Sequence, residues 1–180
     1  MNKINCFVLC FLENFCKKKR HKIMKSVLLE HLNCREKRIL ICEKGICIFL
    51  NKENEKVFVY YSNAYKDNFG VCVFSYSFRV GIDIEKIENI KKIIYKSDFY
   101  PQIIDTAKYS YAKSTEFSTV LWCLHEAVGK LEGTGFAKHY RIEQILHSTV
   151  RYNCGETNKS ANYKAFIGKV YAFVLVYNKI

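Results

Sequence analysis

The sequence has few of the residues that usually separate one structural segment from the next. Its 180 residues include one proline, Pro101, and eight glycines, so domain boundaries are hard to place. A chain that is 49% hydrophobic and 15% aromatic can nevertheless bury a sizeable core, which excludes disorder throughout. The length suits one domain or two small lobes.

Acidic residues are also scarce, since 17 Asp and Glu stand against 29 Lys and Arg and leave a formal net charge of +12. This excess can simply keep the surface solvated, or it can serve a polyanionic partner such as nucleic acid, an acidic protein or a phosphate-rich small molecule. The aromatic residues lie in apolar runs and are not interleaved with Lys and Arg. No stacking platform for nucleic acid is therefore indicated, and we expect no nucleic-acid partner.

Nine cysteines are present, but no Cys-x-x-Cys pair and no Cys/His pairing at zinc-finger spacing occurs among them. Most lie inside apolar segments, as Cys42 and Cys47 do, where a free thiol behaves as a small hydrophobic side chain. An odd number of cysteines favours a reducing compartment, so we expect a cytoplasmic protein.

No hydrophobic run is long. The apolar residues 6–12 are too few to span a membrane, lack a cleavage site and are followed by the basic cluster 17–20. We expect a buried first strand there, and no membrane partner.

The hydrophobic pattern predicts a mixed α+β chain without the regular βα alternation of a doubly wound sheet. The clearest helix covers residues 114–132, with one apolar stripe and a glycine stop at 133–135. A second helix is expected over 13–32, a helical or irregular stretch over 85–96 and a polar loop over 153–162. Strands are expected over residues 5–12, 57–61, 70–76, 78–84, 149–153, 163–168 and 170–177, with a hairpin over 38–50 around Lys44-Gly45.

A first cluster of polar residues ends the predicted strand at 78–84. Asp83 and Glu85 are two residues apart, so in a strand they point to the same face. Two neighbouring carboxylates are suitable ligands for a Mg²⁺ ion that also binds phosphate oxygens. A solvated acidic strand end explains the same pair when it is taken alone.

A second cluster lies on the predicted helix. Glu126 and Lys130 are four residues apart and share a helical face with Trp122. An ordinary surface ion pair would have the same spacing. A zinc protease is rejected, because Gly129 stands where His-Glu-x-x-His requires its second histidine.

The two clusters, in this order and about 40 residues apart, resemble the signature of the 4′-phosphopantetheinyl transferase superfamily. That signature is a Gly-x-Asp strand followed by a Trp-x-x-Lys-Glu-Ala/Ser-x-x-Lys helix, and a Glu two residues after the Asp is similar to the surfactin-type, monomeric branch. The resemblance is strong over residues 80–136 and extends in outline over 38–85. It implies an α+β fold of two similar lobes, residues 1–78 and 79–180, each a small antiparallel sheet packed on a helix, in a monomer.

The resemblance also implies roles for single residues. Asp83, Glu85 and Glu126 match the acids that hold Mg²⁺ against the coenzyme A pyrophosphate. Glu126 matches the proposed general base, and Lys130 matches the lysine that contacts the phosphate under attack. Asp83, Glu126 and Lys130 are therefore the expected catalytic residues.

Two positions depart from the family pattern. His125 stands where a lysine is usual, and Tyr61, with Ser62 beside it, stands where we expect the family's phosphate-binding histidine. We expect all three residues, with Lys130, to contact coenzyme A. Because a histidine loses its charge near neutral pH, the affinity for coenzyme A is expected to depend on pH.

The implied activity is that of a holo-[acyl-carrier-protein] synthase. It is the Mg²⁺-dependent transfer of 4′-phosphopantetheine from coenzyme A to a serine of an acidic acyl or peptidyl carrier protein, which leaves adenosine 3′,5′-bisphosphate. Such carriers serve fatty acid, polyketide or nonribosomal peptide synthesis. Two alternatives stay open: a degenerate relative that binds coenzyme A without transfer, and a basic nucleic-acid-binding module.

Overall fold

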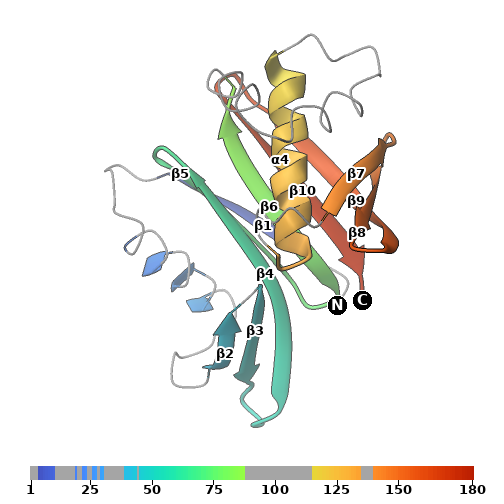
Figure 1. Ribbon diagram of the computed structural model, residues 1–180. Coiled ribbons are helices and arrows are strands. Elements are labelled where there is room, and N and C mark those ends of the chain that lie inside the picture. Colours follow the sequence, from blue (N-terminus) through green and yellow to red (C-terminus); the bar gives the residue numbers. More distant parts are fainter. Residues whose placement is uncertain are drawn as a thin grey trace.

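The protein is an α+β molecule with two antiparallel sheets, as the sequence predicts (Figure 1). The computed structural model describes residues 4–10, 39–43, 45–87, 115–134 and 140–180, together with the helical residues 19, 22–23, 26–27 and 29–30. In these parts of the chain no helix is both long enough and apolar enough to cross a membrane.

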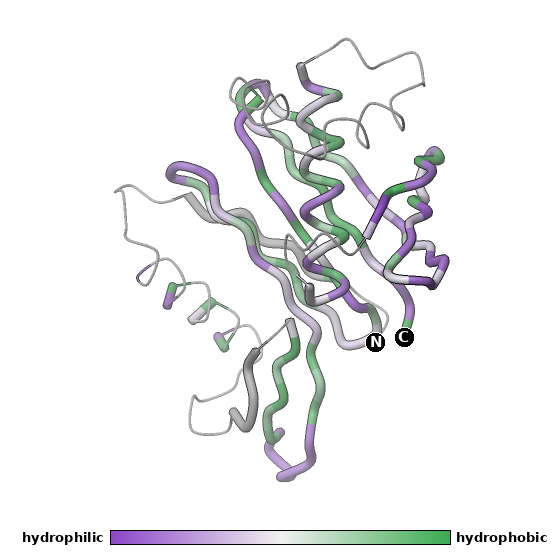
Figure 2. Tube along the Cα trace, in the orientation of Figure 1, coloured by the Kyte–Doolittle hydropathy of each residue, from purple (hydrophilic) through white to green (hydrophobic). Residues whose placement is uncertain are grey.

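The first sheet contains five strands in the order β1-β5-β4-β3-β2. The strands are β1 (Ile4–Cys10), β2 (Ile39–Glu43), β3 (Ile46–Leu50), β4 (Lys56–Lys66) and β5 (Phe69–Ser75). The predicted hairpin at 38–50 is confirmed as β2 and β3, with Gly45 at a φ of 78° between them. The turns that join β3 to β4 and β4 to β5 are hydrophilic, whereas β3 is hydrophobic along its length (Figure 2).

The second sheet also contains five strands, in the order β6-β10-β9-β8-β7. They are β6 (Phe78–Lys86), β7 (Tyr140–Ile145), β8 (Thr149–Cys154), β9 (Thr157–Ile167) and β10 (Tyr171–Lys179). Helix α4 (Thr115–Leu131) lies across one face of this sheet (Figure 1). The helix ends where the sequence predicts, because Gly133 adopts a φ of 70° and Thr134 donates its N–H to the carbonyl of Gly129.

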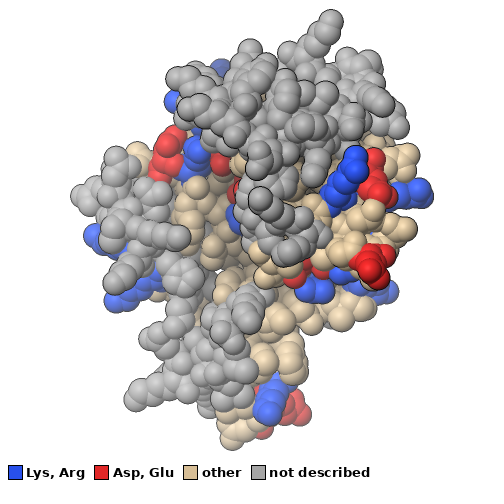
Figure 3. Space-filling view, in the orientation of Figure 1, with Lys and Arg blue, Asp and Glu red and all other residues tan. Residues whose placement is uncertain are grey.

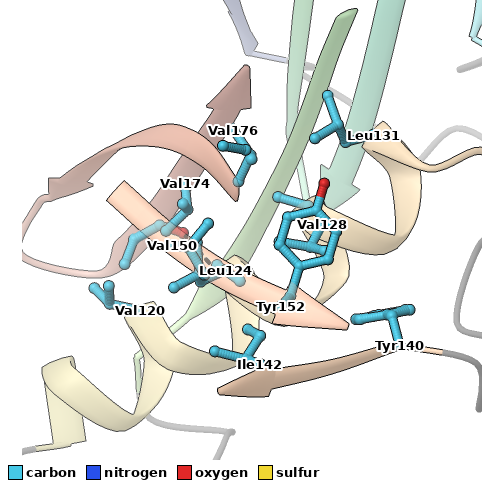
Figure 4. Close-up of a cluster of buried hydrophobic side chains, with 14 of the residues drawn as sticks. Val120, Leu124, Val128, Leu131, Tyr140, Ile142, Val150, Tyr152, Val174 and Val176 are labelled. Carbon is cyan, nitrogen blue, oxygen red and sulfur yellow. Dashed lines mark hydrogen bonds between the residues drawn. The ribbon is translucent and has the colours of Figure 1, made fainter. Parts of the chain in front are cut away.

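The larger hydrophobic core lies between α4 and the second sheet. The apolar stripe of the helix interdigitates with side chains of β7, β8 and β10 (Figure 4). Burial of these side chains is the main favourable term that holds the helix on the sheet. The fully enclosed members include Leu124, Val128, Val150, Tyr152, Val174 and Val176.

A second core joins the two sheets. Val71 and Val73 of β5 pack with Ile82 and Ile84 of β6 and with Leu175 of β10. This contact places the end of β4 beside β6. The division of the chain into lobes at residues 78 and 79 stays a prediction, although the change from the first sheet to the second falls between Ser75 and Phe78.

Two strands of the second sheet differ from the prediction. The stretch 153–162 is not a loop: a tight turn at Gly155, with a φ of 62°, leads directly into β9. Most side chains of β9 are exposed, so its polarity resembles that of a loop. Strand β7 has no counterpart among the predicted elements.

Other predictions fall partly outside the described residues. The stretch predicted as helical or irregular from residue 85 begins as strand, because β6 runs to Lys86, while residues 88–96 lie outside the described part. Within 13–32 the described residues are helical, and the others lie outside it. Cys47, Cys72, Cys123 and Cys154, which lie in the described part of the chain, form no disulfide there.

Gly81 explains how closely β6 approaches α4. A Cβ atom on this residue would lie 2.0 Å from the carbonyl oxygen of Ala127 and 2.7 Å from the backbone nitrogen of Leu131. Both are backbone atoms, so neither can turn aside as a side-chain end could. Only glycine lets the strand and the helix approach to this distance.

We expect Gly81→Ala to lower the free energy of unfolding by at least about 2 kcal/mol, because β6 and α4 must separate. Gly168→Ala is the control, since the added Cβ there would meet its nearest atom, the carbonyl oxygen of Tyr171, at 3.3 Å. Urea unfolding of both variants measures the difference. Similar losses in the two variants would contradict the argument from close packing.

Candidate active site

Strand β6 presents a row of alternating residues to α4. Val80, Ile82 and Ile84 pack toward the first sheet. Because neighbouring side chains in a strand point to opposite faces, Gly81, Asp83 and Glu85 face the helix. The carboxylates thus follow directly after the point of closest backbone approach.

Asp83 is joined to the helix by Lys130. The ammonium of Lys130 donates hydrogen bonds to Asp83 Oδ1 at 2.8 Å and to the carbonyl oxygen of Ile82 at 3.0 Å. Burial raises the pKa of Asp83 from 3.8 to about 6, and the charge and hydrogen bond of Lys130 limit that rise. Lys130 therefore keeps a buried carboxylate largely ionised at neutral pH.

Glu126 lies one helical turn before Lys130, and the charges of Asp83 and Glu85 act on its carboxylate. Burial raises its pKa from 4.5 to about 7, the negative charge of Asp83 adds to the rise, Lys130 opposes it and Glu85 contributes further. A carboxylate with a pKa near the working pH is suited to accept a proton and to release it again.

Glu85 is paired with a residue of the first sheet. The ammonium of Lys66, at the end of β4, lies 2.5 Å from Glu85 Oε2. Both side chains are mostly buried, at 22% and 14% exposure. The site therefore contains residues from both sheets.

These acids form a donor set that fits a hard divalent cation. Carboxylate oxygens are the ligands that Mg²⁺ prefers. Among the described residues no N–H or O–H group is well placed to donate a hydrogen bond to the buried Asp83 Oδ2, and the charges of Asp83 and Glu85 add to the burial that raises the pKa of Glu126. In the described part of the chain no three His, Cys, Asp or Glu side chains are already grouped as ligands, so the acids would have to close on the ion.

His125 is buried rather than open to a ligand. Its side chain is 2% exposed, and its ring lies 4.6 Å from the ring of Tyr140. The Tyr140 hydroxyl donates to the carbonyl of residue 125 at 2.7 Å, so His125 Nδ1 must donate to that hydroxyl at 2.6 Å.

Burial lowers the pKa of His125 from 6.5 to about 4, so the ring is neutral from pH 6 to 8.5. The geometry favours a packing role and gives no support to a pH-dependent phosphate contact. A contact with coenzyme A at this residue stays a prediction.

Tyr61 and Ser62 point to opposite faces of β4. Tyr61 packs beside the cluster that contains Val59 and Phe74. Ser62 is buried on the other face, where its Oγ accepts a hydrogen bond from the Ile82 backbone nitrogen at 3.1 Å. The structure therefore brings Ser62 to β6 but does not bring Tyr61 to the acids, and their contacts with coenzyme A stay predictions.

Lys66 is the residue of the site that the sequence analysis missed. Ser62 and Lys66 are four residues apart in one strand, so they share the face that meets β6. That periodicity was the available signal. The sequence analysis could not use this periodicity, because it ended the strand at residue 61, whereas β4 runs to Lys66.

The sequence matches the family described as the 4′-phosphopantetheinyl transferase superfamily over residues 79–173, which is more than half of the chain. The chain belongs to this superfamily. It is thus a transferase of the 4′-phosphopantetheinyl kind, and the matched region contains Asp83, Glu85, Glu126 and Lys130. Transferases of this superfamily use coenzyme A and Mg²⁺ and act on carrier proteins. No curated protein matches the chain.

The buried His125 of this transferase should make the folded state less stable in acid. The unfolded chain gains a proton at His125 as the pH falls below about 6.5, whereas the folded chain does so only near pH 4. As the pH falls from about 6.5 to about 4, we expect His125 to lower the free energy of unfolding by about 1.4 kcal/mol for each pH unit. Asp83 and Glu126 contribute the opposite slope, because their pKa values are raised.

The difference between wild type and His125→Asn isolates the contribution of the imidazole. Asn retains a donor for the Tyr140 hydroxyl but does not titrate. Urea unfolding at pH 4.5, 5.5 and 7 should show a smaller acid loss in His125→Asn than in wild type. The exposed His147→Asn variant should follow wild type. If the free energy of unfolding depends on pH in the same way in wild type and His125→Asn, the imidazole is not held buried in its neutral form.

Proposed function

We propose that this chain transfers 4′-phosphopantetheine from coenzyme A to a serine of a carrier protein, with Mg²⁺ bound by Asp83, Glu85 and Glu126. The observation that carries the proposal is the convergence of the two polar clusters. Lys130 of α4 lies 2.8 Å from Asp83 of β6, and the charges of Asp83 and Glu85 raise the pKa of Glu126.

In the proposed reaction the hydroxyl oxygen of the carrier serine attacks the phosphorus next to pantetheine. A new bond joins that oxygen to phosphorus, and the bond from phosphorus to the bridging diphosphate oxygen breaks. The bridging oxygen leaves with adenosine 3′,5′-bisphosphate. Glu126, in its ionised form, accepts the serine proton.

A bound Mg²⁺ would neutralise charge on the diphosphate oxygens as the leaving group departs. The residues of this chain have separate tasks. Asp83, held in place by Lys130, and Glu85 would orient their oxygens toward the ion. Glu126 would be positioned beside them, at a pKa of about 7 that lets it take up a proton near neutral pH. Lys130 would also approach the phosphate that is attacked.

The finer assignments belong to the same proposal. We propose a surfactin-type, monomeric enzyme of the cytoplasm that acts on an acidic acyl or peptidyl carrier protein. The excess of basic residues supports an acidic partner. On the described surface seen in Figure 3, most Lys and Arg side chains lie near Asp or Glu side chains.

Mass spectrometry of an apo carrier protein after incubation with the enzyme, coenzyme A and Mg²⁺ tests the proposal. We expect a gain of about 340 Da, the mass of the transferred group. Glu126→Gln should reduce the rate at least about 100-fold, because it removes the base. Glu116→Gln, an exposed change on the same helix, should leave the rate unchanged.

Two results would contradict the proposal in different ways. Tight binding of coenzyme A without any gain in carrier mass would identify the degenerate relative. Transfer that is equally fast in Glu126→Gln would show that another group accepts the serine proton.

A further inference from the structure

The turn between β4 and β5 is held against the acids of the second sheet. Lys66, directly before this turn, is paired with Glu85 at 2.5 Å. The Tyr171 hydroxyl donates to Asp67 Oδ2 at 3.0 Å, and the rings of Phe69 and Tyr171 lie 4.6 Å apart. These two contacts, at the residues that directly follow Lys66, hold the turn against Tyr171 beside the site.

The charges of the site are close to balance. The three acids Asp83, Glu85 and Glu126 face the two ammonium groups of Lys66 and Lys130, so the set has a small negative charge when every group is ionised. A coenzyme A diphosphate is itself an anion and would be repelled by this set. A divalent cation bound by these acids would reverse the sign of the total charge, so the two ammonium groups could attract phosphate.

The two lysines differ in how firmly they are held. Lys130 has two acceptors, Asp83 Oδ1 and the carbonyl oxygen of Ile82, and both lie on one strand. Lys66 has an ion pair with Glu85, a predicted metal ligand. A lysine ammonium on a four-carbon stem can change partner by side-chain rotation alone, without movement of the strand.

We propose that Lys66 is a phosphate-binding residue of the site, which pairs with Glu85 in the free protein and turns to the coenzyme A diphosphate when a divalent cation binds Glu85. The proposal rests on the proposed function, because it takes Glu85 as a metal ligand. In this proposal the first sheet contributes a positively charged side chain for phosphate, which the uncharged Tyr61 cannot do. It also explains why an ammonium is buried at the end of β4.

Ser62, on the same face of β4 as Lys66, is not available to bind the diphosphate. Its hydroxyl already accepts the N–H of Ile82 and is 7% exposed. Among the described side chains of β4 that face β6, Lys66 is the charged one nearest to Glu85. In the proposed reaction the diphosphate, rather than the distant 3′-phosphate of coenzyme A, is the group that would share a metal ion with Glu85.

Calorimetric titration of wild type and Lys66→Met tests the proposal. In the presence of Mg²⁺, Lys66→Met should weaken the binding of coenzyme A about ten- to a hundredfold, the value of one charge-assisted contact. Dephospho-coenzyme A, which lacks the 3′-phosphate, should show the same loss. Lys66→Arg should recover much of the affinity, and Lys179→Met, an exposed lysine at the other end of the second sheet, should bind like wild type.

Binding of the metal ion alone gives a second measurement, in which Lys66→Met should raise the affinity instead of lowering it. Without coenzyme A, Lys66→Met should bind Mn²⁺ at least about threefold more tightly than wild type, because a competing positive charge is gone. A lysine that only joins the two sheets would instead lower the melting temperature and leave both affinities unchanged. That result would overturn the proposal, as would a loss seen with coenzyme A but not with dephospho-coenzyme A.

The wild-type protein separates this inference from the proposed function. If wild type does not bind coenzyme A in the presence of Mg²⁺, the proposed function itself is wrong. If wild type binds coenzyme A and Lys66→Met binds it equally well, only the role of Lys66 is wrong.

Discussion

At Gly81 the backbone of β6 lies against the backbone of α4, and this close packing determines the geometry of the site. A side chain at Gly81 would meet backbone atoms of Ala127 and Leu131, so the strand and helix could not hold their present separation. Asp83 is two residues further along the same face, and Lys130 is on the adjoining turn of the helix. The close approach of the two backbones brings Asp83 within a 2.8 Å hydrogen bond of Lys130.

The same proximity makes the electrostatics of the site sensitive to small changes. Burial raises the pKa of Asp83 to about 6 and that of Glu126 to about 7, and the negative charge of Asp83 further disfavours the ionisation of Glu126. Lys130 and Lys66 offset part of this cost. The two lysines neutralise the negative charge of the three acids only in part. Binding of a divalent cation by these acids would therefore be electrostatically favourable.

The first sheet does more than support the second. Its hydrophobic face packs on β6 and β10, and Ser62 accepts the N–H of Ile82, the residue before Asp83. Lys66 then reaches Glu85 from the same strand face. The position of the acids therefore depends on both sheets, and the contact between the sheets is part of the site rather than a separate structural feature.

The sequence by itself determined the fold class, helix α4 with its glycine stop, most strands, and the residues that match the superfamily. These features are local, because hydrophobic periodicity and short motifs depend on neighbours in the chain. The exposed strand β9, the burial of His125 beside Tyr140 and the ion pair of Lys66 with Glu85 were decided by tertiary structure. His125 and Tyr140 are 15 residues apart, and only packing in three dimensions brings their rings together. Lys66 joins Glu85 because the end of β4 lies beside β6 in the folded chain, and the sequence of one strand does not encode which residues of another sheet will lie next to it.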